Sequence, residues 1–196
     1  IGGNSGHPNG DGQIGGSVGA ITLNNVQLIS NITAFGGNSS VGSGGAGGNI
    51  SIINSNILTS LIIVNISGGM GLVANGADGT FRLNQTAFYN SNGSIRFSYV
   101  STKNLTFNSI LSIRNNSAYV NSTNYLDYNV SANVTLCNLP MTFANPVILK
   151  DGVTCGSSCY NFTSLNAGTV IFNVSSWSNY SIGEVPNYPP NVTSVS

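Results

Sequence analysis

Two glycine-rich stretches have the spacing that binds dinucleotide phosphates, G-x-G-x-x-G. The matches lie at Gly42, Gly44 and Gly47, and at Gly10, Gly12 and Gly15. Such a motif binds phosphate where a strand precedes it and a helix follows, because the helix N-terminus supplies the amides and the dipole. After Gly47 the sequence alternates at Asn49-Ile50-Ser51-Ile52, which predicts a strand. The sequence therefore argues against a nucleotide site, and the 25 glycines among the 196 residues need a structural role.

Residues for nucleophilic or acid–base catalysis are sparse. The stretch Gly15-Gly16-Ser17-Val18-Gly19 has the spacing of a nucleophile elbow, but a strand is predicted after it and the one histidine, His7, precedes it. Polysaccharide lyases and hydrolases need clustered carboxylates, or Ca²⁺ with a basic residue. Asp78 and Arg82 lie close in sequence, but Asp78 sits in the turn-like stretch Asn75-Gly76-Ala77-Asp78-Gly79. We therefore predict no catalytic residues, no cofactor and no enzyme activity.

The charge of the chain excludes several classes of partner. Charged residues make up 5% of it, and five basic and five acidic side chains give a net charge of zero. Nucleic acid and anionic membrane surfaces need a basic footprint, so neither is expected. The most apolar run, residues 57–66, contains Thr59, Ser60 and Asn65 and is shorter than the roughly 20 residues that span a bilayer, so no membrane insertion is expected. Ile1 is not a start methionine and no signal-peptide pattern opens the chain, so we expect a processed product or an internal piece.

Asparagine is followed two positions later by serine or threonine throughout the chain. The 30 Asn and 42 Ser plus Thr residues would give about six N-x-S/T sequons by chance, whereas the sequence has 15. Strands rich in Asn and Thr can also generate this pattern by alternation. The excess favours an extracellular or cell-surface protein that carries N-linked glycans. The candidate sites are Asn31, Asn38, Asn49, Asn65, Asn84, Asn92, Asn104, Asn115, Asn121, Asn129, Asn133, Asn161, Asn173, Asn179 and Asn191.

Short β-type segments repeat at a spacing of 30 residues. Three of them, at residues 19–24, 49–54 and 79–84, end at an asparagine, and a shorter one follows at residues 104–108. A period of roughly 20 to 50 residues built from strands alone is typical of a parallel β-helix. In that fold the final asparagines stack in a ladder at one corner, about 4.8 Å apart. The predicted ladder consists of Asn24, Asn54, Asn84 and Asn108.

The glycine-rich stretches at residues 36–48 and 68–79 are predicted to be loops at one corner of successive coils. There the chain must turn sharply and the backbones approach closely, and glycine allows both. Their exposed tips could contact a ligand, since binding is often carried by loops on a rigid scaffold.

The sequence changes character after about Tyr125. We predict an all-β protein with parallel β-helix coils over residues 1–126, a small disulfide-containing β cap module over residues 127–182, and a Pro-rich linker with a terminal strand over residues 183–196. The cap contains the one Trp, all three Cys and the turn Asp151-Gly152. The linker is expected to be stiff and extended.

The coils resemble the right-handed parallel β-helix of pectate-lyase-like proteins and many adhesins. The cap segment is similar to a module that lies beside such coils in large, sequon-rich archaeal surface proteins. This similarity covers about a quarter of the chain, and it implies surface display, often next to immunoglobulin-like domains, without an established chemistry. The residues that carry it are Phe143-Ala144-Asn145-Pro146, residues 149–155, Cys159, residues 172–174 and residues 177–181.

Cys155 and Cys159 flank Gly156-Ser157-Ser158, a loop that can bring two sulfurs together. A disulfide is their expected state in an oxidising environment. Cys137 is not part of this pair and would be either a small buried apolar residue or a thiol paired with another chain. A zinc site would need a fourth ligand, and His7 is far along the chain from the cysteines, so no metal site is predicted.

Two aromatic pairs, Trp177 with Tyr180 and Tyr125 with Tyr128, could stack on sugars, but such residues more often fill a core, which is our interpretation. We predict a non-catalytic structural or adhesive segment that associates with itself or with neighbouring domains. In one form, a strand at Val192 to Val195 pairs with a sheet edge of another copy and builds a filament. The alternative is a carbohydrate-active β-helix, either an enzyme or a glycan-binding module.

Overall fold

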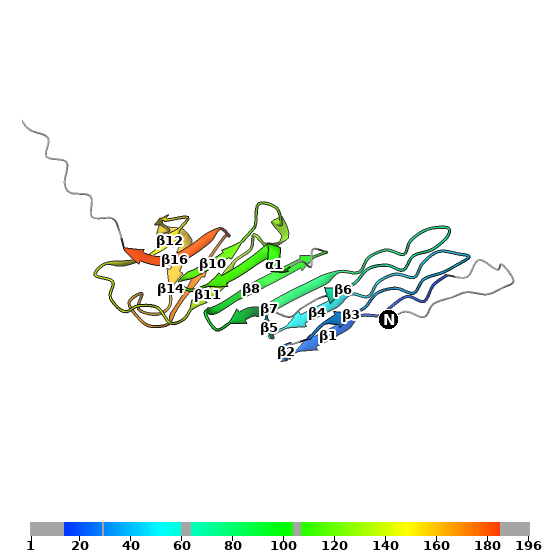
Figure 1. The fold of residues 1–196 in the computed structure, drawn as a ribbon, viewed down its shortest axis with the longest axis horizontal. Helices are drawn as coiled ribbons and strands as arrows, with labels where there is room; N and C mark the ends of the chain where they lie inside the picture. Colours follow the sequence, from blue (N-terminus) through cyan, green and yellow to red (C-terminus); the bar gives the residue numbers. More distant parts are fainter. Residues whose placement is uncertain (1–13, 29, 60–63, 104–106, 185–196) are drawn as a thin grey trace, which may run out of the picture.

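The computed structural model describes residues 14–28, 30–59, 64–103 and 107–184. Within these ranges an arm of extended glycine-rich segments projects from a body of two β-sheets (Figure 1). Strands dominate the described residues, so the predicted all-β class is confirmed. The elements are β1 (Ile21–Asn24), β2 (Gln27–Leu28), β3 (Ile32–Thr33), β4 (Ile50–Ile53), β5 (Asn56–Leu58), β6 (Val64–Asn65), β7 (Phe81–Asn90), β8 (Gly93–Thr102), α1 (Phe107–Ile110), β9 (Leu111–Arg114), β10 (Ser117–Val120), η1 (Leu126–Tyr128), β11 (Ala132–Leu136), β12 (Pro146–Lys150), β13 (Val153–Thr154), η2 (Gly156–Ser158), β14 (Cys159–Asn161), β15 (Val170–Val174) and β16 (Asn179–Glu184).

The larger sheet begins as a parallel sheet and ends as an antiparallel one. Its order is β1-β4-β7-β8-β11-β15-β14, and β2 and β5 extend it beside β7. β1, β4 and β7 are parallel neighbours, but the tight hairpin at Ser91-Asn92 then reverses the chain, and the later neighbours are antiparallel. The predicted right-handed parallel β-helix is therefore wrong, because the chain folds back as a hairpin where a solenoid needs another coil.

The predicted asparagine ladder is displaced by one residue. Asn24 pairs with Ile53, and Ile53 pairs with Asn84, so Asn54 does not lie between the other two asparagines. Asn108 lies in α1 and not at the end of a strand. The repeat of 30 residues was correct in spacing, but the strands pair in a register that the repeat alone could not specify.

The residues that stack at this corner are Asn25, Asn54 and Gln85. All three have a left-handed backbone, with φ values of 56°, 49° and 47°. The Asn25 amide donates to the Ile53 carbonyl at 3.1 Å, and the Asn54 amide to the Asn84 carbonyl at 2.9 Å. Backbone hydrogen bonds therefore join the corners, and asparagine suits the position because it tolerates the left-handed conformation.

Five extended segments form the glycine arm, at residues 15–19, 34–39, 43–48, 66–71 and 74–79 (Figure 1). Their backbones bond to neighbouring segments at every third residue. Three successive residues of segment 43–48 bond to three different neighbours, which is the geometry of a polyproline II-type helix, with three residues per turn and no internal hydrogen bonds. The bonds of this segment run from Gly15 N to Ser43 O, Val18 N to Ala46 O, Gly44 N to Ala74 O, Gly47 N to Ala77 O, Gly45 N to Gly37 O and Gly48 N to Ala34 O.

Glycine is required in the arm because the backbones touch. A Cβ on Gly44 would lie 1.8 Å from the Gly69 carbonyl oxygen, and a Cβ on Gly45 would lie 2.3 Å from that of Gly16. A Cβ on Gly19, at the base of the arm, would meet nothing within 4 Å. The predicted close approach of backbones is confirmed. The sharp corner is not, because these stretches run outward and return as extended segments.

The body is held by one apolar core between the larger sheet and a second sheet, β13-β12-β16-β10-β9. Phe97 lies at its centre, with ring centroids 6.0 Å from Phe88, 5.7 Å from Tyr128 and 5.6 Å from Trp177. Each of these side chains is at most 4% exposed. Large aromatic side chains from both sheets therefore stabilise the body.

The predicted boundary between residues 126 and 127 falls inside this body. β8 pairs with β11 in the larger sheet, and β10 pairs with β16 in the smaller one. The predicted coils and the predicted cap thus share both sheets and the core. Within the cap, the turn Asp151-Gly152 joins β12 to β13 as expected, with Lys150 paired to Val153.

Candidate functional site

The carboxylates of the body and arm accept hydrogen bonds from the backbone. Asp78 Oδ1 accepts from the Gly68 amide at 2.9 Å, across the arm. The Asp151 carboxylate accepts from the Asn179 amide, and Glu184 accepts from an amide in the loop before β12. These acids hold turns and strand ends in place. Among the residues that the structure describes, no three His, Cys, Asp or Glu side chains gather into a group that could hold a metal ion.

The amides of the G-x-G-x-x-G stretch already have partners in the protein. Gly42 donates to a serine hydroxyl, and Gly44 and Gly47 donate to carbonyls of the adjacent arm segment. The strand β4 follows the motif, as predicted. Ser17, the central residue of the G-x-S-x-G stretch, accepts a hydrogen bond from an arm amide at 3.1 Å and is followed by β1. Both motifs therefore serve the packing of the arm.

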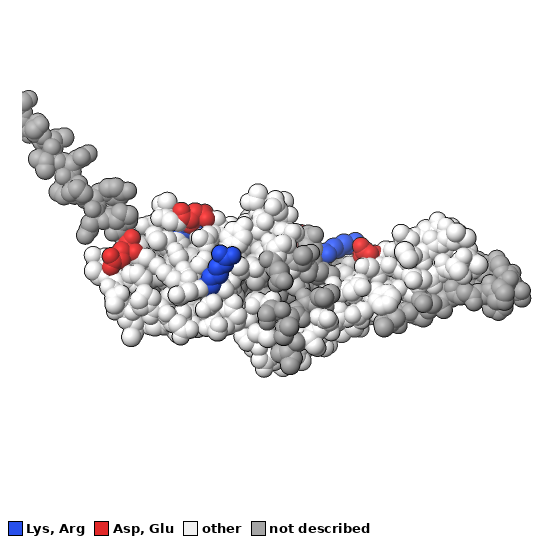
Figure 2. Space-filling view, viewed as in Figure 1, with Lys and Arg blue, Asp and Glu red and all other residues white. Residues whose placement is uncertain are grey.

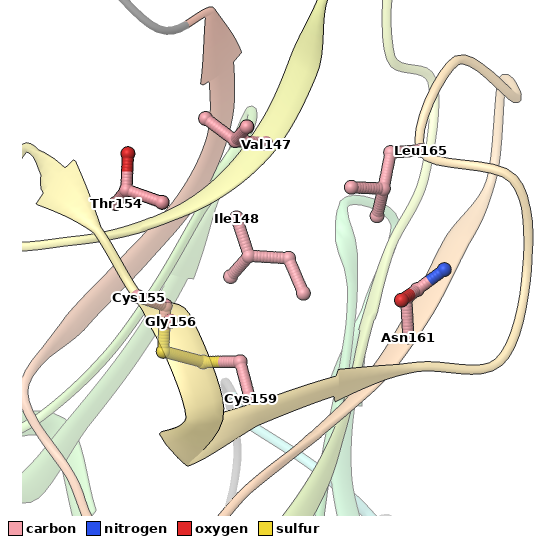
Figure 3. Close-up of a pocket in the computed structure, with 8 residues that line it drawn as sticks. All are labelled: Val147, Ile148, Thr154, Cys155, Gly156, Cys159, Asn161 and Leu165. Carbon is pink, nitrogen blue, oxygen red and sulfur yellow. A yellow bond between two sulfur atoms is a disulfide. The ribbon is translucent and has the colours of Figure 1, made fainter.

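The predicted disulfide between Cys155 and Cys159 is confirmed. It bridges the edge strands of the two sheets, because Cys155 follows β13 and Cys159 begins β14. A cavity of about 190 Å³ lies beside it, where Ile148 and Leu165 face the sulfurs and Asn161 (Figure 3). Apart from the two bonded cysteines, its lining contains no ionisable side chain, so it offers no acid or base.

The aromatic residues considered for sugar stacking lie in the body. Tyr128, Trp177 and Tyr180 are buried in the core, which confirms that interpretation for these three. Tyr125 is half-buried and hydrogen-bonds to a serine hydroxyl at 3.0 Å. Burial, and to a lesser degree the charge of Asp127, raises the pKa of the Tyr128 phenol well above its usual value, so this residue stays neutral.

The sequon asparagines differ in how their side chains are used. A glycan is attached to Nδ2, so an asparagine that uses this atom inside the fold must break contacts to accept one. Asn173 Nδ2 donates to two oxygens of the preceding strand region and to Asn133 Oδ1, and Asn161 Nδ2 donates to a backbone carbonyl. Asn84, on β7, and Asn115, at the β9–β10 hairpin, are exposed and use no side-chain atom in a hydrogen bond within the described residues.

The outer turn of the glycine arm carries three exposed apolar side chains, which we call the arm tip. Met70, Leu72 and Val73 are 68%, 75% and 73% exposed. The Met70 amide donates to Asn38 Oδ1 at 2.8 Å, and the Val73 amide donates to the Gly42 carbonyl at 3.2 Å. The signal in the sequence was an apolar run between two glycine stretches, a place where a solvated turn would carry polar residues.

Charged side chains are few and scattered over the face shown in Figure 2, which is mostly neutral. In the part of the chain that the structure describes, no helix has the length and apolar character needed to cross a membrane. Cys137 is a half-buried free thiol. His7, Asn104, Asn191 and the strand predicted at Val192 to Val195 lie outside the described residues.

The described fold and surface define an all-β protein with a glycine arm and with ionisable groups kept apart. Comparison of the chain with protein-family models, with curated proteins and with solved structures finds no match. The function is therefore inferred from the geometry of the arm, the body and their surfaces.

Proposed function

We propose that this chain is a non-catalytic structural and adhesive segment of a glycosylated cell-surface or extracellular protein. The observation that carries the proposal is the glycine arm with its exposed tip. Segments bonded to several neighbours at every third residue resist bending, and they hold Met70, Leu72 and Val73 in water. Grouped apolar residues on a protein surface mark interaction sites. The arm thus presents a contact surface at a distance from the body.

The composition supports display outside the cell. A disulfide persists in oxidising compartments and is rare in the cytosol. The 15 sequons exceed chance more than twofold. Sugars would also supply the hydration that a chain with 5% charged residues lacks, because neutral proteins tend to associate.

Glycopeptide mapping of the native protein tests the glycosylation. We expect sugar on Asn84 and Asn115, whose side chains are exposed and unbonded within the described residues. We expect none on Asn173, because its Nδ2 is bonded within the sheet. An intact mass equal to that of the bare polypeptide would contradict this part of the proposal.

The adhesive role is tested by replacing the arm tip. In the variant Met70→Ser, Leu72→Ser and Val73→Ser the backbone bonds of the turn remain, so the arm keeps its shape. We expect beads coated with this variant to lose most of their pull-off force from the source cells. The matched control is Leu126→Ser, Met141→Ser and Val153→Ser, three side chains of the body that are 74%, 68% and 71% exposed. Equal adhesion of both variants and the parent would refute adhesion by the tip.

Self-assembly into a filament is a further part of the proposal. β1 ends the larger sheet and β14 ends it on the other side, so both present strand edges in the described residues. Sedimentation at rising concentration should show growing oligomers, and truncation after Glu184 should abolish them by removing the strand predicted at residues 192–195. A protein that stays monomeric at high concentration would contradict assembly.

Catalysis is the alternative that a direct screen can decide. Turnover of acidic or neutral polysaccharides that is abolished by Asp78→Ala would replace the structural proposal with an enzyme. We expect no turnover, since Asp78 is engaged with the Gly68 amide and no second acid or base joins it in a described group.

A further inference from the structure

A row of side chains crosses the outer face of the larger sheet, one from each of seven strands. Residues opposite one another on neighbouring strands share a face. The inward neighbours of the row, such as Ile95, Val134 and Phe172, are buried in the core, so the row itself faces solvent. This outer row consists of Gln27, Asn56, Ala87, Arg96, Asn133, Asn173 and Tyr160.

A pocket of about 140 Å³ opens in the middle of the outer row. Arg96, Asn133 and Asn173 line it, together with serine hydroxyls. Arg96 Nη2 donates to Asn56 Oδ1 at 2.9 Å, which carries the guanidinium across the small side chain of Ala87. Arg96 Nη1 also donates to a backbone carbonyl of β7. The cation is therefore held in one orientation beside the pocket.

The acceptors that hold Arg96 are neutral. A guanidinium has five N–H donors, and no carboxylate bonds to this one within the described residues. Asn133 Nδ2 and Asn173 Oδ1 have no hydrogen-bond partner in the described part of the chain, although the two residues bond to each other through Asn173 Nδ2 and Asn133 Oδ1 at 2.9 Å. The pocket thus offers a cation, a donor and an acceptor, which suit an anion that carries hydroxyl groups.

Two exposed aromatic rings stand at the end of the outer row. Tyr160 pairs with Asn173 across the sheet and is 67% exposed, and Phe162 is 54% exposed. Their ring centroids are 5.3 Å apart. They belong to the edge strand β14 and the residues just after it, so no described strand covers them on that side. An aromatic face packs well against the C–H groups of a pyranose ring.

We propose that the outer row binds a glycan chain that contains uronate units. The uronate carboxylate pairs with Arg96, hydroxyl groups bond to Asn133 and Asn173, and an adjoining sugar ring packs on Tyr160 and Phe162. Binding needs both asparagines free of attached sugar, and the use of Asn173 Nδ2 inside the sheet agrees with that requirement. The site is separate from the arm tip and does not depend on the proposed adhesive role.

Calorimetry with the full 196-residue chain, disulfide formed and glycan-free, tests this site. The probes are an alginate hexamer, which is a uronate chain, and cellohexaose, which is neutral. We expect the alginate hexamer to bind more tightly, with an affinity that falls as salt rises. Arg96→Gln, and Tyr160→Ala combined with Phe162→Ala, should each weaken binding at least tenfold.

Asn133→Asp is a second variant that preserves the fold. It keeps the oxygen that accepts from Asn173 Nδ2, but it places a negative charge beside Arg96. It should weaken alginate binding at least tenfold with an unchanged melting temperature. Arg114→Gln and Tyr119→Ala are matched controls, because these residues line a comparable pocket on the outer face of the other sheet. They should change the affinity less than twofold.

Three results would overturn the assignment. Alginate hexamer that does not bind, or that binds no better than cellohexaose, excludes a uronate site. Affinity that survives Arg96→Gln and Asn133→Asp but falls with the control variants places the site on the other sheet. Sugar found on Asn133 or Asn173 in native material means that the outer row is covered. None of these results bears on adhesion by the arm tip.

Discussion

The glycine arm and the body of this protein are stabilised by different interactions. The body buries large aromatic side chains, among them Phe81, Phe97 and Phe172, between two sheets. The arm has few side chains to bury, and its segments touch through their backbones, with hydrogen bonds at every third residue. The comparison shows how a chain poor in charge can build a long rigid projection: removing the side chains lets backbones approach until their amides and carbonyls pair.

The largest expected effect tests the body. Phe97→Ala removes a fully buried ring that contacts three other aromatic rings, and it should lower the free energy of unfolding by about 3 to 5 kcal/mol. Urea denaturation monitored by tryptophan fluorescence measures it, since Trp177 is one of the three contacts. Tyr99→Ala is the control on the same strand, because Tyr99 is 50% exposed. A loss for Phe97→Ala as small as that of the control would contradict the aromatic core.

The next effect tests the arm. Gly45→Ala places a Cβ against two backbone carbonyls and should destabilise the arm by about 1 to 3 kcal/mol, as overpacking does. Hydrogen exchange should show faster exchange at the amides of Gly48 and Gly69, with body amides unchanged. Gly19→Ala should be neutral or slightly stabilising, since its Cβ meets open space. If both variants behave alike, close backbone packing does not hold the arm together.

The disulfide links the two sheet edges, so its loss should weaken the body and leave the arm intact. For two cysteines four residues apart the chain-entropy estimate is about 2 kcal/mol. Unfolding of the Cys155→Ser, Cys159→Ser variant measures this loss. Thiol labelling of the unreduced, denatured parent should find one reactive cysteine, Cys137. Three reactive cysteines would refute the pairing.

The smallest expected effect lies at the corner where the arm-side strands meet the body. Asn54 has a left-handed backbone and Asn24 does not, so Asn54→Ala should cost about 1 kcal/mol, whereas Asn24→Ala should cost little. Asn54→Gly should restore the stability, because glycine adopts this conformation freely. Thermal unfolding distinguishes the three variants. Equal costs for Asn24→Ala and Asn54→Ala would argue against the observed register.

Several local features could be predicted from neighbouring residues. The alternation at residues 49–52 predicted a strand, and β4 is there. The turn Asp151-Gly152 and the disulfide were also predicted, because each depends on residues within a few positions of one another. The hairpin that ended the parallel pairing had a signal as well, since Asn92-Gly93 lies between alternating segments. The repeat outweighed that signal and led to the β-helix prediction.

The amino-acid sequence by itself determined which segments are extended, which residues turn, which cysteines pair and how little charge the surface carries. The tertiary structure alone decided the register of the parallel strands, the direction of β8 and the assembly of the outer row. Arg96, Asn133 and Asn173 share no spacing in the sequence, and only strand pairing places them together. The physical reason is that backbone conformation responds to adjacent residues, whereas pairing direction and register depend on which distant apolar faces can be buried together.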